Sequence, residues 1–417
     1  MFSVIFRGFP SENGIGNPAL REKIPACPLP NGEFSSRLDA LTAPRIPFTE
    51  KSPNVPDLPE NNFYIDTPEA LNSFLGDLSA QGSKRCAVDT EADSLHSYKE
   101  KLCLIQFSAG DYHSIIDPLL IRTESLGPLN DFMGKTEVWM HGADFDMSML
   151  KRTFDRIPPK IYDTQTAARL SGTRQFGLAN LVEDVFGVVL SKQSQRANWG
   201  RRPLLDKMIE YALNDVRYIL PLADHYMAKL RELGREEWFF ESCEHARTTV
   251  SGRPVPDADN LWRINGSGKL KPNGMNFLRA LWHWRDKEAE RLDRPSFKVI
   301  GNVEILQFSE QLAAGHEAKL PERFPISAAR RFHNAVRDAR ETPPENWPKR
   351  KFGKRMERNP EADKLFESLK QKRDKIGTEL DIDPSLIASR NVLEMISFQP
   401  STAPEQLLNW QRKLLDI

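Results

Sequence analysis

The chain has little cysteine, no long apolar run and no excess of either charge, and each of these features excludes a class of protein. The 417 residues include only four cysteines, and these form neither a CxxC pair nor a disulfide framework. Such usage is typical of the reducing cytoplasm. No apolar run approaches the ~18 residues of a membrane span, and the opening MFSVIFRGF, interrupted by Arg7, is too short for a signal peptide. We therefore expect a cytoplasmic protein without a membrane partner.

The 58 basic and 58 acidic side chains balance overall but are unevenly distributed. From Asn260 onward the chain carries 29 Lys and Arg against 22 Asp and Glu, a net charge of +7, which leaves −7 for the part before it. An acidic front (residues 1–259) that can bind metal ions and a basic rear (residues 260–417) suit an enzyme that acts on a polyanion. Ordinary charge scatter is the alternative explanation.

The length allows two to four domains, and composition sets one of them apart. Residues 1–59 hold ten of the 30 prolines and little periodicity, so we expect this segment to be disordered. In residues 275–291 an apolar stripe at helical spacing, followed by further helical patterns, predicts a helical bundle over 269–342. We expect a connector over 231–268, a basic linker over 343–360 and a second bundle over 361–417.

Two carboxylates leave the same face of a strand predicted at 86–91. Side chains at i and i+2 of a strand point to one side, so Asp89 and Glu91 lie together. Carboxylates this close repel unless a divalent cation lies between them, and oxygen ligands suit Mg²⁺ or Mn²⁺. The run LCLIQF at 102–107 predicts the partner strand of a hairpin. A solvated strand end would explain Asp-x-Glu by itself, so the other motifs decide.

Two predicted helices add further candidates. Gly142 permits a tight strand-to-helix turn before a helix at 144–154, whose inner face we assign to Phe145, Met149 and Leu150. Asp146 lies in its first turn, where the helix dipole favours a carboxylate. Asp163 is better explained as the N-cap of the next helix than as a metal ligand.

A long helix predicted at 203–230 carries Tyr211 and Asp215 at i and i+4, so these two residues share a face. Leu213 and Val216 are free to pack against the sheet. Before this helix, the loop KQSQRANWGRR at 192–202 interleaves basic, amide and aromatic residues, as phosphate contacts and base stacking require. A surface loop with a buried Trp199 is the alternative.

Together these motifs resemble the DEDD 3′–5′ exonucleases, in the subclass with a tyrosine, and most closely the ribonuclease D family. The resemblance covers about residues 60–230, in VDTEA at 88–92, HGADFD at 141–146, YDTQTAA at 162–168, RPL at 202–204 and YALNDVRYILPL at 211–222. One departure is Asn198-Trp199, where this family usually has Asp-Trp. The resemblance implies a ribonuclease-H-like mixed sheet flanked by helices. The bundle after it resembles the HRDC domain, whose implied role is to bind nucleic acid with a basic face, and the second bundle is predicted to be HRDC-like.

The resemblance also implies the site and the reaction. Two divalent metal ions, Mg²⁺ or Mn²⁺, would be held by four carboxylates: Asp89, Glu91, Asp146 and Asp215. Tyr211 would help to orient the attacking water, and the expected substrate contacts are His141, Gln106, Lys192, Arg196, Trp199 and Arg202. The implied reaction trims the single-stranded 3′ ends of RNAs such as tRNA precursors and releases nucleoside 5′-monophosphates. We expect a monomer and no small-molecule cofactor.

Two other functions stay open at this point. One is a 3′–5′ DNA exonuclease of the same fold that acts in repair, which a contact to the ribose 2′-hydroxyl would distinguish. The other is a nucleic-acid-binding protein that has lost catalysis. The presence of all four carboxylates argues against the second.

Overall fold

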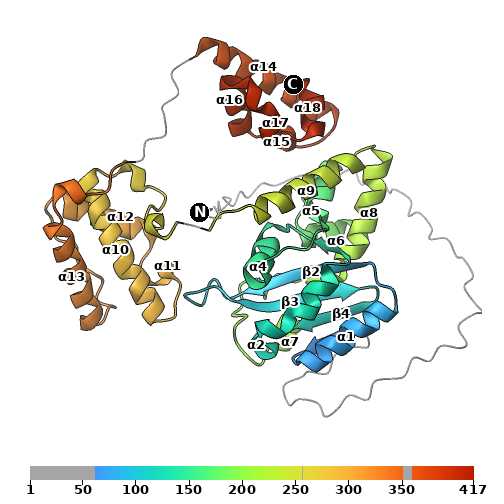
Figure 1. Ribbon diagram of the computed structural model, residues 1–417, viewed down its shortest axis with the longest axis horizontal. Helices are drawn as coiled ribbons and strands as arrows, with labels where there is room; N and C mark the ends of the chain where they lie inside the picture. Colours follow the sequence, from blue (N-terminus) through green and yellow to red (C-terminus); the bar gives the residue numbers. More distant parts are fainter. Residues whose placement is uncertain (1–61, 256, 351–358) are drawn as a thin grey trace, which may run out of the picture. The chain divides into compact units, whose positions relative to one another are not determined.

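A six-stranded mixed sheet lies at the centre of the first part of the chain (Figure 1). The computed structural model describes residues 62–255, 257–350 and 359–417; the predicted disordered segment, 1–59, lies outside them. In the order β1-β4-β3-β2-β5-β6, only β3 is antiparallel to its neighbours. The strands are β1 Asn62–Ile65, β2 Arg85–Ala92, β3 Leu102–Ala109, β4 Tyr112–Ile116, β5 Glu137–Met140 and β6 Ile161–Asp163. The predicted mixed sheet is confirmed.

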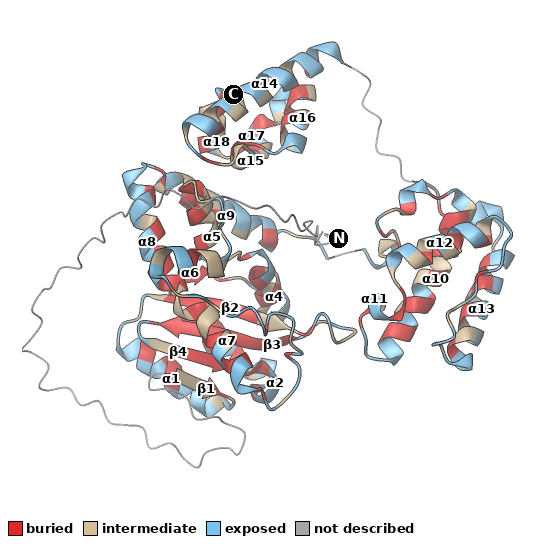
Figure 2. Ribbon diagram, turned by 180° about the vertical axis from the view of Figure 1, so that it is seen from behind, coloured by how far each residue is buried: buried red, intermediate tan, exposed pale blue. Residues whose placement is uncertain are grey.

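Helices cover both faces of this sheet, because alternate residues of its strands point to opposite sides. Val88 of β2 joins a core with α1, α3 and α4, whereas its neighbour Ala87 faces a second core with α5, α8 and α9. Figure 2 shows the central strands as buried. The helices of this part are α1 Pro68–Ala80, α2 Pro118–Ile121, α3 Gly127–Met133, α4 Asp144–Phe154, α5 Thr164–Leu170, α6 Leu178–Phe186, α7 Asp206–Arg217, α8 Ile219–Glu232 and α9 Glu236–Ser251.

The long helix predicted at 203–230 is two helices, α7 and α8, which meet at Tyr218. Pro221 supplies the physical reason. Proline has no backbone N–H to donate to the carbonyl of Arg217, and its ring clashes with that carbonyl, so a continuous helix is interrupted there. The prediction was wrong about continuity, but Tyr211 and Asp215 both remain on α7.

The segment predicted as a connector, 231–268, contains α9, which packs against α4, α5 and β6. Phe239 of α9 is fully buried. Lys151 of α4 donates from Nζ to the carbonyl oxygens of Ser251 and Arg253, at 2.6 and 3.1 Å. The sheet-containing part of the chain therefore extends through Arg253.

The basic rear is helical, as predicted. Around Leu278, Leu281 and Phe332 a separate apolar core forms between α10, α12 and α13. The helices are α10 Pro272–Arg291, α11 Ser296–Val299, α12 Asn302–Ala313, α13 Ile326–Glu341, α14 Pro360–Glu379, α15 Pro384–Ile387, α16 Arg390–Phe398, α17 Ala403–Gln406 and α18 Asn409–Leu415. Short 3-10 helices lie at Thr123–Leu126, Ala258–Asn260, Ser267–Lys269, Pro344–Asn346 and Pro400–Thr402. Within the described ranges, no helix has the length and apolar character needed to cross a membrane.

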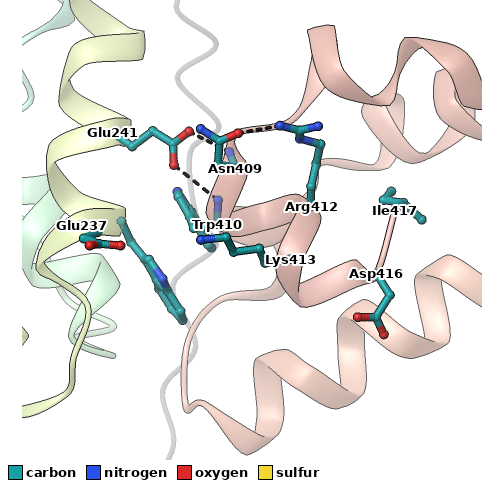
Figure 3. Close-up of a pocket in the computed structure, with 9 residues that line it drawn as sticks. Glu237, Glu241, Asn409, Trp410, Arg412, Lys413, Asp416 and Ile417 are labelled. Atoms are coloured by element: carbon teal, nitrogen blue, oxygen red, sulfur yellow. Dashed lines mark hydrogen bonds between the residues drawn. The ribbon is translucent and has the colours of Figure 1, made fainter.

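Residues of α9, of α18 and of the chain end after α18 line a pocket of about 940 Å³ (Figure 3). The rings of Trp238 and Trp410 stack with their centroids 4.8 Å apart. Glu241 accepts hydrogen bonds from the backbone N–H groups of Asn409 and Trp410, at 2.7 and 3.3 Å. These residues attach the last helix to α9, so their role is explained by packing.

Candidate active site

The end of β2 presents two carboxylates to one side of the sheet. Asp89 is paired with Gln106 of β3, and Glu91 with Leu104, so both acids lie on the face that also carries Ala87. A register shift between Glu91 and Ala92 interrupts the ladder immediately after them. Bulges of this kind end strand pairing beside active sites and re-aim the side chains there.

The third carboxylate, Asp146, enters from the first turn of α4. Its side chain is 4% exposed and accepts a hydrogen bond of 2.5 Å from the hydroxyl of Thr90. The turn before α4 needs Gly142, whose φ is +71°, and is held by Asp163. One Asp163 oxygen accepts from the N–H of Gly142 at 2.8 Å and, as the predicted N-cap of α5, from the N–H of Gln165.

The fourth carboxylate, Asp215, and the phenol of Tyr211 lie one turn apart on α7. The Tyr211 hydroxyl is hydrogen-bonded to Asp215. The Tyr211 ring packs against Trp199, with the ring centroids 6.0 Å apart. Leu213 is buried against β3 and β4, as predicted, and thereby fixes the rotation of α7.

These elements bring the predicted acids together. Oxygen atoms of Asp89, Glu91 and Asp215 all lie within 4.8 Å of one another. Asp146 is not part of this group, but it lies close enough for its charge to raise the pKa of Asp89 and of Glu91. A partly buried set of carboxylate oxygens fits hard divalent cations such as Mg²⁺ and Mn²⁺, which also remove the repulsion between the acids.

Burial and the charges of neighbouring carboxylates raise the pKa of each of these four acids. Burial, and then the neighbouring carboxylates, raise the pKa of Glu91 to about 9 and hold that of Asp89 well above its usual range. Burial raises the pKa of Asp215 and of Asp146 to about 7, against the opposing hydrogen bonds from Tyr211 and Thr90. Burial also raises the pKa of Tyr211, so its phenol stays protonated and remains a donor.

Two of the expected substrate contacts are buried and a third is paired inside the protein, which argues against these three predictions. Gln106 is 0% exposed and Trp199 is 1% exposed, so neither offers a surface to RNA. All three guanidinium nitrogens of Arg202 are used internally: Nε and Nη2 donate to the carboxylate of Asp117 at 2.5 and 2.8 Å, and Nη1 donates to the carbonyl of Trp199 at 2.7 Å. The alternative of a loop with a buried Trp199 is therefore the correct one.

Asp117 and Tyr64 are residues that motif reasoning missed. The side chain of Asp117 is fully buried, pairs with Arg202 and accepts a hydrogen bond from the Tyr64 hydroxyl. This cluster anchors the loop at 192–202 and so holds Trp199 against Tyr211. The only sequence signal was that Asp117 precedes Pro118, a common start of a short helix.

The remaining expected contacts fall into two groups. His141 bonds through Nδ1 to the hydroxyl of Thr164 at 2.9 Å, and burial lowers its pKa, so it belongs to the turn before α4. Lys192 and Arg196 are exposed on the loop. Arg196 lines a pocket of about 100 Å³ with Glu91, Leu95 and other residues.

Phe145 also lines this pocket, which corrects its assignment to the inner face of α4. The helix begins at Asp144, so Phe145 lies in its first turn, beside the carboxylates, and is 43% exposed. Met149 and Leu150 are buried as predicted, together with Met147.

A mixed sheet that brings four carboxylates and a tyrosine to one strand end defines a metal-dependent nuclease, and the comparisons specify which one. Residues 62–231 match the family model described as 3′-5′ exonuclease. Ribonuclease D of Xanthomonas oryzae is 31% identical over 85% of this chain and 96% of its own length, and that of Escherichia coli is 27% identical over 85% and 92%. The chain belongs to the ribonuclease D family. It is a 3′–5′ exoribonuclease that uses two divalent metal ions.

Solved structures show the same fold. A protein from Bifidobacterium adolescentis aligns with a TM-score of 0.71 at 21% identity, over 84% of this chain and 94% of its own. Escherichia coli RNase D, described as an exoribonuclease involved in structured RNA processing, aligns with a TM-score of 0.64 at 23% identity, over 85% and 99%. The likeness extends beyond the sheet into the helical rear.

The raised pKa values predict how stability depends on pH without metal. The folded chain binds these protons more tightly than the unfolded chain, whose carboxyls titrate near pH 4. The free energy of unfolding therefore falls as pH rises from about 4 to about 9. In chelator, Glu91→Gln should be more stable than the unsubstituted protein, by about 1–3 kcal/mol at pH 8 and by less at pH 5. Urea unfolding at both pH values measures this difference.

The control for this experiment is Glu210→Gln on the same helix as Asp215. Glu210 is exposed, so its neutralisation should change stability little at either pH. Added Mg²⁺ should stabilise the unsubstituted protein more than Glu91→Gln. A Glu91→Gln gain that does not depend on pH would show that Glu91 is not held in a repulsive cluster.

Proposed function

We propose that this exoribonuclease trims single-stranded 3′ ends of structured RNAs, tRNA precursors among them, one nucleotide at a time. The observation that carries the proposal is the pocket of about 100 Å³ beside the carboxylates. Glu91 forms one wall, Leu95 and Phe145 are exposed enough to contact a base, and Arg196 supplies positive charge for a phosphate. A space of this size suits one unpaired base and is too small for a base pair.

The residues divide the chemistry among them. The four carboxylates would hold the two cations, Mg²⁺ or Mn²⁺, which supply Lewis-acid stabilisation of the negative charge on the phosphate and on the leaving oxygen. Tyr211 keeps its proton, which it donates to Asp215, and its hydroxyl oxygen accepts a hydrogen bond from the attacking water and so helps to orient it. Leu95 and Phe145 hold the terminal base so that its phosphodiester lies over the acids. The product is a nucleoside 5′-monophosphate.

We propose that the bundle built from α10 to α13 is an HRDC domain that binds RNA, and that the last five helices form a second, HRDC-like bundle. On α13 three exposed arginines, Arg330, Arg337 and Arg340, recur at i, i+7 and i+10, so they share one face of the helix. Arginine and lysine supply many of the phosphate contacts of nucleic-acid-binding proteins, so a face with three arginines suits the backbone of an RNA strand.

Location and oligomeric state complete the proposal. Cys86, Cys103 and Cys243 are free and buried, which supports a reducing compartment such as the cytoplasm. The carboxylates and the tyrosine all come from one chain, so a monomer suffices for catalysis.

The substrate proposal is tested with a tRNA precursor that carries a 3′ extension and a DNA oligonucleotide of the same 3′ sequence. With Mg²⁺ or Mn²⁺, we expect stepwise shortening of the RNA to the base-paired stem and release of nucleoside 5′-monophosphates. Preferred degradation of the DNA would favour the repair exonuclease instead. Cleavage within the stem would contradict the assignment of the small pocket.

Removal of the Tyr211 hydroxyl tests the division of roles. Tyr211→Phe should lower kcat by about 10- to 1,000-fold, the scale of one positioned hydrogen bond in a transition state. KM should change little, because the metal ions hold the phosphate. The matched control is Tyr112→Phe, whose hydroxyl accepts a hydrogen bond from Gln81 at 3.3 Å at the far end of β4; it should leave kcat near that of the unsubstituted enzyme. Full turnover by Tyr211→Phe would reduce the phenol to a packing role.

The arginine face of α13 is tested in the full-length protein by replacing Arg330, Arg337 and Arg340 with Gln. Each phosphate contact releases counterions, so the slope of log binding constant against log salt should become shallower by about 2 for three single-strand contacts. Binding of the tRNA precursor across a salt series, in an Asp146→Ala background that prevents degradation, measures this slope.

Replacement of three exposed lysines of the nuclease part, Lys84, Lys135 and Lys229, removes the same charge and serves as the control. Lys84 and Lys135 precede β2 and β5, so they lie at the end of the sheet opposite to the acids. Equal slopes for the two triple variants would show that α13 does not contact RNA.

A further inference from the structure

Gln106 occupies an unusual place for an amide. It lies in the middle of the sheet, 0% exposed, directly opposite Asp89 on β2 and directly opposite Ile115 on β4. Directly opposed residues have Cβ atoms about 4.5–5.5 Å apart, so the carboxamide is within reach of the Asp89 carboxylate. Helix α7 covers this part of the sheet with Ala212 and Leu213, which pack in one cluster with Ile115.

Packing does not explain the choice of glutamine. Within the described part of the chain, neither Oε1 nor Nε2 of Gln106 has a hydrogen-bond partner. A buried amide without partners destabilises a fold by about 1–3 kcal/mol, and an apolar residue of similar size would avoid this penalty. Its neighbours across and along the sheet, Ile115 and Leu104, are apolar. The feature that sets this position apart is Asp89 on the next strand.

The other carboxylates show a common pattern. Asp146 accepts a hydrogen bond from the hydroxyl of Thr90, and Asp215 is bonded to the hydroxyl of Tyr211. Both partners are neutral donors. A neutral donor stabilises an ionised carboxylate without bringing a positive charge that would compete with a metal cation, as lysine or arginine would.

We propose that Gln106 is a positioning residue that completes this pattern when the acids hold metal ions: its unpartnered Nε2–H then donates to the ionised Asp89 carboxylate, directly or through one water. The contact fixes the orientation of the carboxylate, so that one oxygen remains free for a metal ion. Gln106 acts through Asp89 and touches neither RNA nor the reacting phosphate. The inference rests on the assignment of Asp89 as a metal ligand.

The test is direct metal binding by the full-length protein without RNA. Gln106→Met keeps the volume and removes both polar atoms. Isothermal titration with Mn²⁺ should show a Kd weaker by about 10- to 100-fold, the usual effect of removing a partner of a metal ligand. The Mn²⁺ concentration that half-saturates turnover should rise in parallel, whereas kcat at saturating Mn²⁺ should change little.

Ile115→Met is the matched control, because it alters packing in the same row under α7 without changing polarity. It should leave Mn²⁺ affinity as it is. Gln106→Leu, which also removes the donor, should weaken binding to a similar extent, and it serves if Gln106→Met does not fold. Unchanged Mn²⁺ affinity in a folded Gln106 variant would overturn the proposal.

A further variant, Asp89→Ala, separates this proposal from the site on which it rests. Mn²⁺ affinity like that of the unsubstituted protein in Asp89→Ala would overturn the metal assignment itself. Loss of affinity in Asp89→Ala, together with full affinity in both Gln106 variants, would reject only the positioning role.

Discussion

Four carboxylates held close together against their own repulsion are the constraint on which the rest of the structure depends. Asp89, Glu91, Asp146 and Asp215 would separate if they were carried on mobile segments, because like charges in a partly buried site repel strongly. The chain places them on a central strand and on two helices that pack directly against the sheet. The packing energy of the surrounding core therefore opposes the repulsion until metal ions bind.

Support for the acids comes from neutral groups. Thr90 bonds to Asp146, and Tyr211 bonds to Asp215. The ion pair of Arg202 with the buried Asp117 belongs to the loop and not to the acids. Because the positive charge of Arg202 is already paired, it does not reduce the attraction of the cluster for cations. The carboxylates that bind metal ions are thus separate from the ion pair that stabilises the loop.

The loop at 192–202 also divides its residues between structural and exposed positions. The loop at 192–202 looks like a nucleic-acid contact in sequence, yet its aromatic residue packs inward and its last arginine fastens it to β4's end. Trp199 then supports the ring of Tyr211 from behind. What the loop offers to RNA is the exposed Lys192 and Arg196, beside a pocket whose apolar surface comes from Leu95 and Phe145. The loop therefore positions the Tyr211 phenol as well as lining the site.

The sequence by itself predicted the five candidate site residues: i, i+2 spacing on a strand and i, i+4 spacing on a helix pair four of them by local geometry, and the family resemblance adds Asp146. It also determined the mixed sheet, the helical rear and the N-cap role of Asp163. Only the tertiary structure decided which polar and aromatic residues face inward. Whether Gln106, Trp199 and Arg202 meet RNA or the core depends on strand register, on the break between α7 and α8, and on a distant Asp117. Such contacts join residues far apart in the chain, so no local pattern encodes them.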